Sequence, residues 1–367
     1  MKIPMVDLKT QYETIKDEVN SAVKEVIEST QFILGKKVSE FEKNCAEYLG
    51  VKHAIACASG TDALQIAMMA LDIKPGDEVI TTPFTFVATA ETIAIIGAVP
   101  VYVDIDEKTY NIDPLKIEAA ITPKTKAIIP VHLYGQSADM DSIMAIARKH
   151  NLYVIEDAAQ SFGTDYKGKK VCGIGDIACT SFFPSKNLGA YGDGGMMFTN
   201  DDTLNQKLRM IAAHGSKERY VHEVLGVNSR LDTLQAAILD VKLKYIDKWN
   251  KARAKNADLY REKLKDAKAV TPYVAEYSTH IYHQFTLRVE NRKGLAEHLT
   301  SKGIPSAVHY PIPLHQQPAF KDDSRKFDLP VAEKIAKDVI SLPMFPELTE
   351  EQIDYIANAI KEFVGTK

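Results

Sequence analysis

The sequence predicts an α/β protein with a large domain, built on a mixed and mostly parallel seven-stranded sheet, and a smaller C-terminal α+β domain. Between about residues 50 and 200, short apolar runs alternate with helical patterns, which is typical of strand-helix repeats. Residues 230–265 contain no Gly or Pro, which predicts one or two long helices leading out of this core. We therefore expect a large domain over residues 1–245, and a linker helix with a small domain over residues 246–367.

Each expected element has its own local signal. The strands are short apolar runs rich in β-branched residues, and the helices show apolar residues three and four positions apart. The expected strands cover residues 54–57, 78–81, 99–103, 127–131, 153–155, 177–183 and 196–199. The expected helices of the large domain cover residues 12–27, 38–49, 61–71, 85–96, 114–121 and 142–150. In the small domain, residues 281–289 resemble a strand, and residues 292–302 and 350–363 resemble helices.

Length, composition and charge narrow the class of protein. The 367 residues can bury a large core, and 45% hydrophobic with 26% charged residues is ordinary for a globular chain. The net charge of −4, without a basic block, makes nucleic acid an unexpected partner.

Cysteine usage and hydropathy indicate the compartment. Cys45, Cys57, Cys172 and Cys179 form no Cys-x-x-Cys pair, so we expect free thiols in a reducing compartment and no metal site. The N-terminus lacks a signal-peptide core, and the longest uncharged apolar stretch, residues 93–103, contains a glycine and a proline. A cytoplasmic protein without a membrane partner is therefore expected.

A single lysine stands in a loop between two apolar runs. Lys186 follows Phe182 and Phe183, and four glycines occur within residues 189–195. Apolar neighbours disfavour the ammonium form, and a neutral amine is the form that adds to a carbonyl as a Schiff base. The alternative is a surface lysine whose stem covers an apolar edge.

A carboxylate ends the apolar run at residues 153–155. Asp157 is followed by Ala158 and Ala159, and such strand ends face the ligand crevice of an open α/β sheet. An aspartate there can keep a pyridine nitrogen protonated, while the alanines leave room for a flat ring. The alternative is that Asp157 caps a following helix.

Two further segments complete a possible cofactor site. In residues 58–64, a glycine turn precedes a helix, so backbone N–H groups and the Thr61 hydroxyl could bind a phosphate; an ordinary helix N-cap is the alternative. Phe84 and Phe86 follow the next strand, where one could stack on a heterocycle and at least one should pack in the core. Phosphate, pyridinium and aldehyde are the three groups by which pyridoxal 5′-phosphate is held, so these segments together predict a site for it.

With these motifs, the sequence resembles the DegT/DnrJ/EryC1/StrS family of sugar aminotransferases, which are pyridoxal-phosphate enzymes of fold type I. The resemblance covers essentially the whole chain. Its motifs are residues 60–64, 76–80, 156–160, 181–186, 192–195 and 226–232. The sequence, including residues 178–181 and 311–313, is most similar to those of transaminases that act on UDP-linked 2-acetamido-3-keto-glucuronate.

The resemblance implies a role for each site residue. Lys186 would form the Schiff base and carry the proton, Asp157 would contact the pyridine nitrogen, and Gln160 the ring oxygen. Phe86 and Ala159 would lie on opposite faces of the ring. The phosphate would be held by Gly60, Thr61 and Ser181, and by Asn228 from a second subunit. A homodimer with shared active sites follows, and the cofactor would pass through its pyridoxamine form during turnover.

The resemblance also implies a substrate. L-Glutamate would donate its amino group to a nucleotide-linked keto-sugar, with C3 of a UDP-linked 2-acetamido-3-keto-uronate of surface polysaccharide (lipopolysaccharide or O-antigen) synthesis as the first choice and a 4-keto-6-deoxy sugar as the alternative. Arg230 could pair with the C6 carboxylate, or else form an intrachain or intersubunit pair with Asp232 or another acid. His309 and Tyr310 could contact the substrate, or else pack at the domain junction. The keto position, the nucleotide, the sugar epimer and the pathway rest on this resemblance alone.

Two other classes of protein compete with this interpretation. A nicotinamide-dependent sugar dehydrogenase would carry Gly-x-Gly-x-x-Gly after its first strand, whereas residues 189–195 have a different spacing and lie late in the chain. A non-enzymatic binding protein on the same fold would not need an intact Lys186 and Asp157. Some relatives replace the lysine by histidine and dehydrate sugars, so the presence of Lys186 favours transamination.

Overall fold

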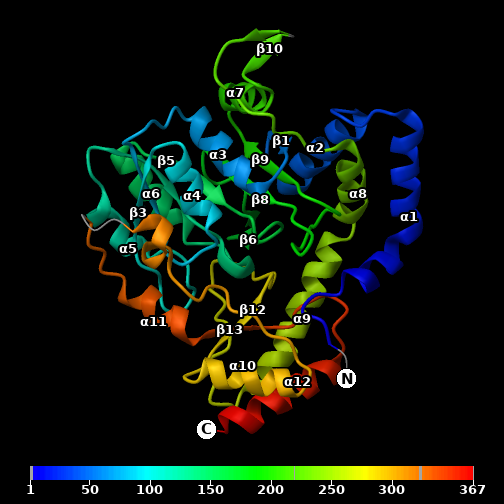
Figure 1. Ribbon diagram of the computed structural model, residues 1–367, viewed down its shortest axis with the longest axis vertical. Coiled ribbons are helices and arrows are strands. Elements are labelled where there is room, and N and C mark those ends of the chain that lie inside the picture. The colour runs from blue at the N-terminus through cyan, green and yellow to red at the C-terminus, as the bar shows by residue number, and fades with distance from the viewer. Residues whose placement is uncertain (1–2, 219, 322–324, 367) are drawn as a thin grey trace.

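The computed structural model describes residues 3–218, 220–321 and 325–366 (Figure 1). Within these residues, seven strands form one sheet in the order β1-β9-β8-β5-β4-β2-β3. Their bounds are β1 (His53–Cys57), β2 (Glu78–Thr81), β3 (Val99–Tyr102), β4 (Thr125–Ile129), β5 (Tyr153–Asp157), β8 (Ile177–Ser181) and β9 (Gly195–Thr199). The predicted seven-stranded sheet is therefore confirmed.

The sheet is mixed, as expected. The pairs β2–β3, β2–β4, β4–β5 and β5–β8 are parallel, whereas β9 runs antiparallel to both β8 and β1. Parallel neighbours place their carboxyl ends at the same edge, which is where α/β proteins bind ligands. Pro100 lies in β3, the edge strand, where a residue without an N–H group is tolerated.

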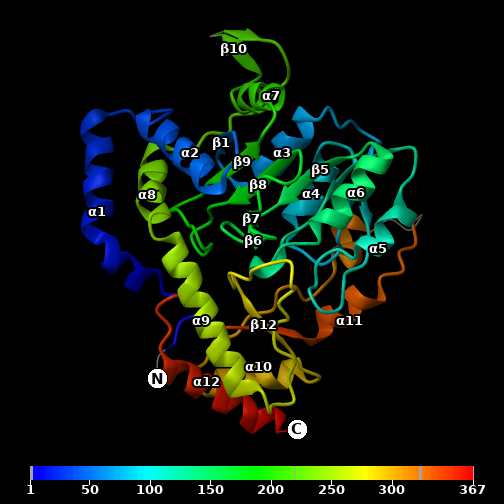
Figure 2. The same ribbon diagram turned by 180° about the vertical axis from the view of Figure 1, so that it is seen from behind.

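Helices cover both faces of the sheet (Figures 1 and 2). Alternate strand residues join different cores: Ile55 and Ile155 pack on one face, Ala54 and Val154 on the other. The first face is covered by α3 (Gly60–Ala70), α4 (Ala88–Ile95) and α7 (Asp202–Ala212), and the second by α2 (Lys36–Leu49), α6 (Met140–His150) and α8 (Thr233–Leu243), with α1 (Leu8–Ser29) packed on α8. Burial on both faces explains why the strands read as continuous apolar runs.

A second core forms in the C-terminal part. The long helix α9 (Ile246–Leu264) crosses from α8 to this part (Figure 2). Its Trp249 joins the core of the sheet, and its Tyr260 joins the second core. The other elements are β12 (Phe285–Arg288), α10 (Arg292–Ser301), α11 (Pro330–Asp338), β13 (Val339–Leu342) and α12 (Glu350–Val364). Because α9 serves both cores, the domain boundary between residues 245 and 246 stays a prediction.

Several elements differ from their predicted bounds. Helix α4 begins at Ala88, because residues 82–87 form a turn in which the Phe84 N–H donates to Thr82 Oγ1. The helix expected over 114–121 is one turn, α5 (Pro114–Ile117), followed by a 3₁₀ turn, and the strand expected over 281–289 is only β12. Elements α7, α11 and β13 were not predicted.

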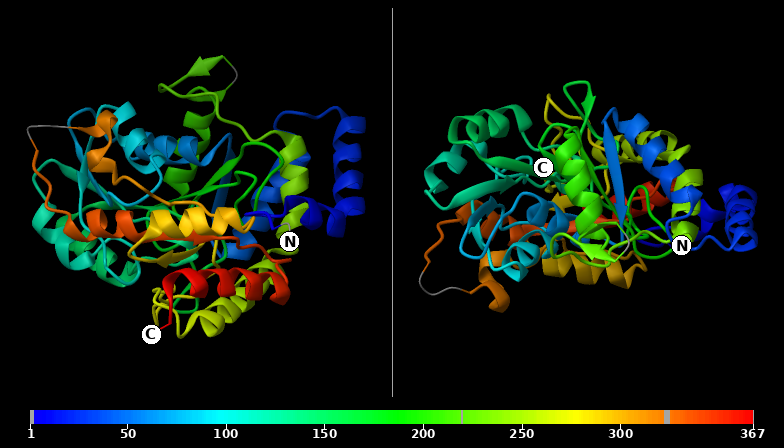
Figure 3. Two further views of the ribbon diagram at one scale, coloured as in Figure 1. Left: turned by 60° about the horizontal axis from the view of Figure 1, so that its bottom comes forward. Right: turned by 90° about the horizontal axis from the view of Figure 1, so that it is seen from above.

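Small hairpins complete the described structure. They are β6 (Asp165–Tyr166) with β7 (Lys169–Lys170), and β10 (Ser216–Glu218) with β11 (Val221–His222). The second hairpin projects from the body of the molecule beyond α7 (Figures 1 and 3). No helix among the described residues has both the length and the apolar character needed to cross a membrane. Nor does that part of the chain gather three or more His, Cys, Asp or Glu side chains around a possible metal.

Candidate active site

A cleft of about 370 Å³ opens at the carboxyl edge of the parallel strands. Most of the residues predicted for a site line it: Gly60, Thr61, Phe86, Asp157, Ala159, Gln160, Ser181, Lys186, His309 and Tyr310. Asn228 and Arg230 do not line it. The structure therefore gathers segments that are far apart in the sequence, as the site prediction required, and leaves two of its residues outside.

Lys186 lies in the loop between β8 and β9. Its N–H group donates to the Phe183 carbonyl at 2.8 Å, and the next side chain, Asn187, donates to Asn250 Oδ1 at 2.7 Å. Burial lowers the pKa of Lys186 to about 8, although the Asp157 carboxylate opposes this shift. The side chain is only partly exposed, toward the cleft, so a large share of its amine is neutral near pH 8.

Asp157 is the last residue of β5 and is 5% exposed. Its Oδ2 accepts from Thr89 Oγ1 at 2.8 Å, and its Oδ1 accepts from the Ala159 N–H at 3.2 Å. Burial raises the pKa of Asp157, while these donors and the Lys186 ammonium oppose the rise. No helix follows directly, since residues 158–164 form turns, so the alternative of a helix cap is wrong.

The turn before α3 provides a place for an anion. Ser59, rather than Thr61, is the N-cap: its Oγ accepts from the Asp62 N–H at 3.0 Å. The N–H groups of Gly60 and Thr61 have no hydrogen-bond acceptor within the helix, because the first turn of a helix provides none. A Cβ at Gly60 would lie 2.7 Å from Ser181 Cβ, so only glycine allows β8 to approach this closely.

An aromatic and amide wall forms one side of the cleft. Phe84 is fully buried in the core whereas Phe86 is 54% exposed, which confirms that at least one of the two packs in the core. The Phe86 ring lies 6.3 Å from that of Tyr310 between centroids. Gln160 Nε2 donates to Tyr310 Oη at 2.9 Å, and Gln160 Oε1 accepts from the Tyr134 N–H at 2.8 Å.

Two residues that line the cleft were missed by sequence reasoning. His283 and Gln284 line the cleft, and His283 Nδ1 and Gln284 Oε1 are buried without a hydrogen-bond partner in the described chain. His309 Nδ1 lies 2.9 Å from Ser341 Oγ, and burial, with help from the Lys186 ammonium, lowers the pKa of His309 to about 4. This part of the cleft is therefore polar and uncharged at neutral pH. A histidine next to an apolar strand gave no local signal for this placement.

The segment with Asn228 and Arg230 runs beside the turn before α3. Ser229 Oγ, between them, donates to Asp62 Oδ2 at 2.6 Å and accepts from the Ala58 N–H at 3.0 Å. Asn228 is exposed and Arg230 is partly exposed. Within the described residues, Arg230 has no carboxylate partner, so the expected alternative of an intrachain pair with Asp232 is absent there.

The fold and this cleft together define an aminotransferase of fold type I. A lysine whose pKa burial lowers to about 8 and a buried aspartate face one cavity, next to a helix start that suits an anion. The model of the DegT/DnrJ/EryC1/StrS aminotransferase family matches residues 13–361, and the chain belongs to this family.

Curated relatives match over nearly their whole length. The chain is 54% identical to a UDP-2-acetamido-2-deoxy-3-oxo-D-glucuronate aminotransferase of Pseudomonas aeruginosa, over 98% of this chain and 99% of the relative. It is 49% identical to a UDP-N-acetyl-3-dehydro-alpha-D-glucosamine 3-aminotransferase of Acidithiobacillus ferrooxidans, over 98% and 97%. It is 53% identical to a protein of Geobacillus stearothermophilus named pleiotropic regulatory protein, over 99% of both chains.

Solved structures agree with this assignment. DesV of S. venezuelae, in complex with a ketimine intermediate, superposes with a TM-score of 0.97 at 40% identity, covering 100% of this chain and 99% of DesV. NtdA of Bacillus subtilis, with the bound cofactor PMP, gives a TM-score of 0.90 at 34% identity, over 99% and 85%. The fold-type I architecture and the aminotransferase class are thereby shown.

Proposed function

We propose that this chain uses pyridoxal 5′-phosphate to move an amino group from L-glutamate to a nucleotide-linked keto-sugar. The observation that carries the proposal is the placement of Lys186 and Asp157 in one cleft, where burial lowers the pKa of Lys186 to about 8 and so favours its neutral, nucleophilic form. A neutral amine is nucleophilic, and a buried carboxylate gains most from a cationic partner such as a pyridinium.

The residues of the cleft fit this cofactor. Gly60, Thr61 and Ser181 would hold its phosphate, Asp157 its ring nitrogen, and Gln160 its ring oxygen; the absence of a side chain at Gly60 lets Ser181 come this close to the turn. Phe86 and Ala159 would cover the two ring faces. When bound, the cofactor supplies an electron-accepting ring. Lys186 Nζ would act as the proton carrier: it would accept the proton from one reacting carbon and deliver it to the other.

The cofactor is tested on the purified protein. An absorbance band near ~400 nm that borohydride bleaches shows a Schiff base, the chemistry expected of a pyridoxal enzyme. Lys186→Ala should lack the band while it keeps the circular dichroism spectrum of the wild type, and its steady-state transamination should be at most a few per cent of wild type. A bleachable band in Lys186→Ala would contradict the assignment of this lysine.

For the acceptor, we propose C3 of a UDP-linked 2-acetamido-3-keto-uronate in surface polysaccharide synthesis. The activities named for two relatives, at 54% and 49% identity, support a UDP-linked 3-keto sugar. Arg230, which lacks an intrachain carboxylate partner in the described structure, would pair with the C6 carboxylate. His309 and Tyr310 would contact the sugar from the cleft wall.

A substrate panel with glutamate as donor tests this choice. The wild type should prefer the 3-keto-uronate over its C6-hydroxymethyl counterpart and over a 4-keto-6-deoxy sugar. Arg230→Lys keeps the charge but loses the planar fork, so kcat/KM for the uronate should fall about tenfold and that for the neutral analogue about threefold or less. Equal losses, or a preference for the 4-keto-6-deoxy sugar, would overturn the substrate and leave the aminotransferase assignment standing.

We further propose a homodimer with shared active sites in the cytoplasm. The exposed Asn228, outside the cleft of its own chain, would contact the phosphate bound by a second copy. Exposed apolar side chains support an interface there: Phe32, Ile33 and Leu34 precede α2, and Val221 and Leu225 lie on or after the projecting hairpin. The cysteines are all free and buried, which fits a reducing compartment.

A regulatory role, suggested by the name of one relative, is a weaker alternative. A protein that only binds a ligand has no need of a lysine with a lowered pKa opposite a buried carboxylate. The substrate panel described above distinguishes an enzyme from a regulator. Binding of nucleotide sugars without any amino transfer would favour the regulatory role.

A further inference from the structure

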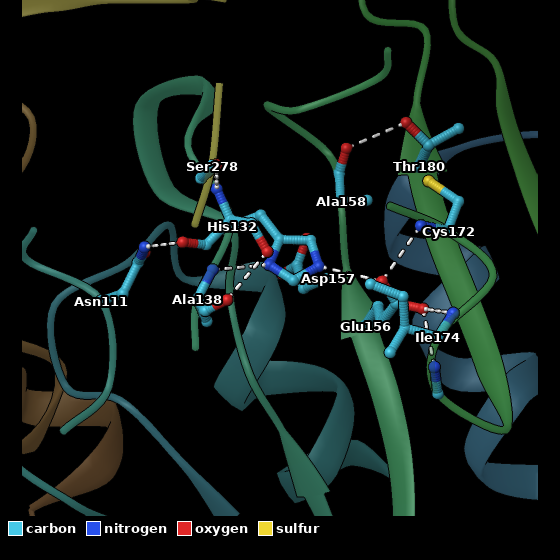
Figure 4. Close-up of polar contacts among 12 residues, drawn as sticks. Asn111, His132, Ala138, Glu156, Asp157, Ala158, Cys172, Ile174, Thr180 and Ser278 are labelled. Atoms are coloured by element: carbon cyan, nitrogen blue, oxygen red, sulfur yellow. Dashed lines mark hydrogen bonds and ion pairs between the residues drawn. The ribbon is translucent and has the colours of Figure 1, made fainter. Parts of the chain in front are cut away.

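A cluster of buried polar side chains lies next to Asp157, on the opposite face of β5 (Figure 4). Successive strand residues point to opposite faces, so Asp157 faces the cleft and its neighbour Glu156 faces the core. Glu156 and His132 are fully buried, and Glu156 Oε2 lies 3.0 Å from His132 Nε2. The function proposed above uses neither side chain.

Glu156 is held as a carboxylate. It accepts hydrogen bonds from the N–H groups of Cys172 at 3.0 Å, Ile174 at 2.8 Å and Gly175 at 2.9 Å. Burial alone would raise the pKa of Glu156, but His132 and these N–H groups outweigh burial and lower the pKa below its ordinary value. A buried charge with four donors is a fixed point in the core.

The hydrogen bonds also define the tautomer of His132. Its Nδ1 accepts from the Ala138 N–H at 3.1 Å, so the ring proton is on Nε2 and is donated to Glu156. The imidazole therefore links three places: the loop after β4, the turn at Ala138 and the strand that carries Asp157.

The main chain of His132 holds Asp157 itself. Strand β4 ends at Ile129, yet the pairing with β5 continues, because the Asp157 N–H donates to the Pro130 carbonyl and the His132 N–H donates to the Asp157 carbonyl, both at 2.9 Å. Beyond the strand end, the loop is also held by Asn111, whose Oδ1 accepts from the Leu133 N–H at 3.0 Å. The side-chain bond of His132 to Glu156 adds a restraint directly next to the two hydrogen bonds of Asp157.

The same loop reaches the cleft wall. Two residues after His132, the Tyr134 N–H donates to Gln160 Oε1 at 2.8 Å, and the Tyr134 hydroxyl donates to the His309 carbonyl. A displacement of the loop would thus move Asp157 and Gln160 together.

We propose that His132, locked to Glu156, is a positioning residue that sets the place of Asp157 and Gln160 in the cleft. The proposal rests on the proposed function, because it concerns the residues assigned to the ring nitrogen and ring oxygen of the cofactor.

Two substitutions separate the two hydrogen bonds of His132. His132→Gln puts an amide nitrogen near the place of Nε2 and keeps the donor to Glu156, whereas His132→Asn puts an amide oxygen near Nδ1 and loses that donor. We expect His132→Asn to weaken the affinity for pyridoxal phosphate about tenfold or more, and His132→Gln to change it about threefold or less. The dissociation constant is measured by titrating the apo-protein.

A double-mutant cycle with Asp157→Asn shows whether His132 acts through Asp157. On the Asp157→Asn background, His132→Asn should weaken cofactor affinity by less than about threefold, because the contact that it positions is already lost. Full additivity of the two effects would overturn the proposal. So would an unchanged dissociation constant in His132→Asn.

Loss of stability alone is controlled by a matched variant. Asn256, buried in α9, donates to the Phe345 carbonyl at 3.0 Å, in the second core away from the cleft. Asn256→Ala should lower the melting temperature without changing cofactor affinity. If His132→Asn also lowers the melting temperature without changing cofactor affinity, the role of His132 is structural only and the proposal fails. If the wild type itself binds no cofactor, the proposed function fails instead.

Discussion

At the residue scale, one physical cause acts on two groups with opposite results. Burial lowers the pKa of Lys186 and raises that of Asp157, so it moves both groups toward their neutral forms. The Coulombic attraction between them opposes both shifts and is too weak to cancel them. The cleft therefore contains a nucleophilic amine and a carboxyl group whose ionised form a cationic ring would stabilise.

The lowered pKa of Lys186 predicts the pH dependence of cofactor capture. Only the neutral amine adds to an aldehyde, so the rate at which apo-protein takes up pyridoxal phosphate should rise as the pH passes about 8 and then level off. Stopped-flow absorbance between pH 6 and pH 10 measures this rate. A rate that still rises steeply at pH 10 would indicate an ordinary lysine.

The raised pKa of Asp157 predicts that Asp157→Asn stabilises the apo-protein. A carboxyl group with a raised pKa in the folded state favours folding at low pH, and this contribution is lost as the pH rises through the folded-state pKa. Urea unfolding should therefore show a stability advantage of the variant that grows from pH 4 to pH 8, to roughly 1 kcal/mol. Activity should fall by orders of magnitude at the same time.

For Asp157→Asn, two results would contradict this account. A stability difference that does not change with pH would mean that burial does not raise the pKa of Asp157. A near-normal single-turnover rate with bound cofactor would mean that its charge is not used.

At the scale of elements, the start of α3 depends on its contact with the end of β8. Gly60→Ala would place a methyl group 2.7 Å from Ser181 Cβ, which should cost about 1–3 kcal/mol of the free energy of unfolding. The double variant Gly60→Ala/Ser181→Gly removes the atom that is struck and should recover part of this loss. Thermal unfolding measures both, and no recovery would show that the steric contact is not the cause.

The sequence predicted most elements but not their exact ends. The seven strands were predictable because each is an apolar run between turn residues, and burial on both faces strengthens that signal. Helix α7, which lies between a buried strand and an exposed hairpin, was missed. Strand β13 was missed because it pairs with β12, which is far away in the sequence. The start of α4 depends on a Thr82 side-chain hydrogen bond, which no periodicity reveals.

The candidate site was predictable where motifs are local. Gly60, Asp157 and Lys186 each stand at a strand end or turn, and the structure places all of them in the cleft. Thr89 was not predictable, since its hydroxyl meets Asp157 only after α4 packs on the sheet. His283 was missed for the same reason: its place in the cleft depends on how the second core docks on the sheet.

At the scale of the whole molecule, the proposed dimer predicts complementation between two inactive variants. Lys186→Ala loses the amine of its own cleft, and Asn228→Ala loses the side chain that we assign to the cleft of a second copy. Subunit exchange should produce mixed dimers in which one of the two sites is intact, so activity should return.

The control for this experiment is each variant mixed with itself, which should stay inactive. Exchange is verified by a mass tag on one variant. If tagged mixed dimers form and activity does not return, the site is built within one chain and the shared-site proposal is wrong.

The central claim is that Lys186 holds the cofactor of an aminotransferase. The most direct measurement is reduction of the purified protein with borohydride in the presence of pyridoxal phosphate, followed by proteolysis and mass spectrometry. We predict a single phosphopyridoxyl group on the peptide that contains Lys186, in near-stoichiometric amount. The absence of the label from that peptide, or a label spread over several surface lysines, would contradict the account.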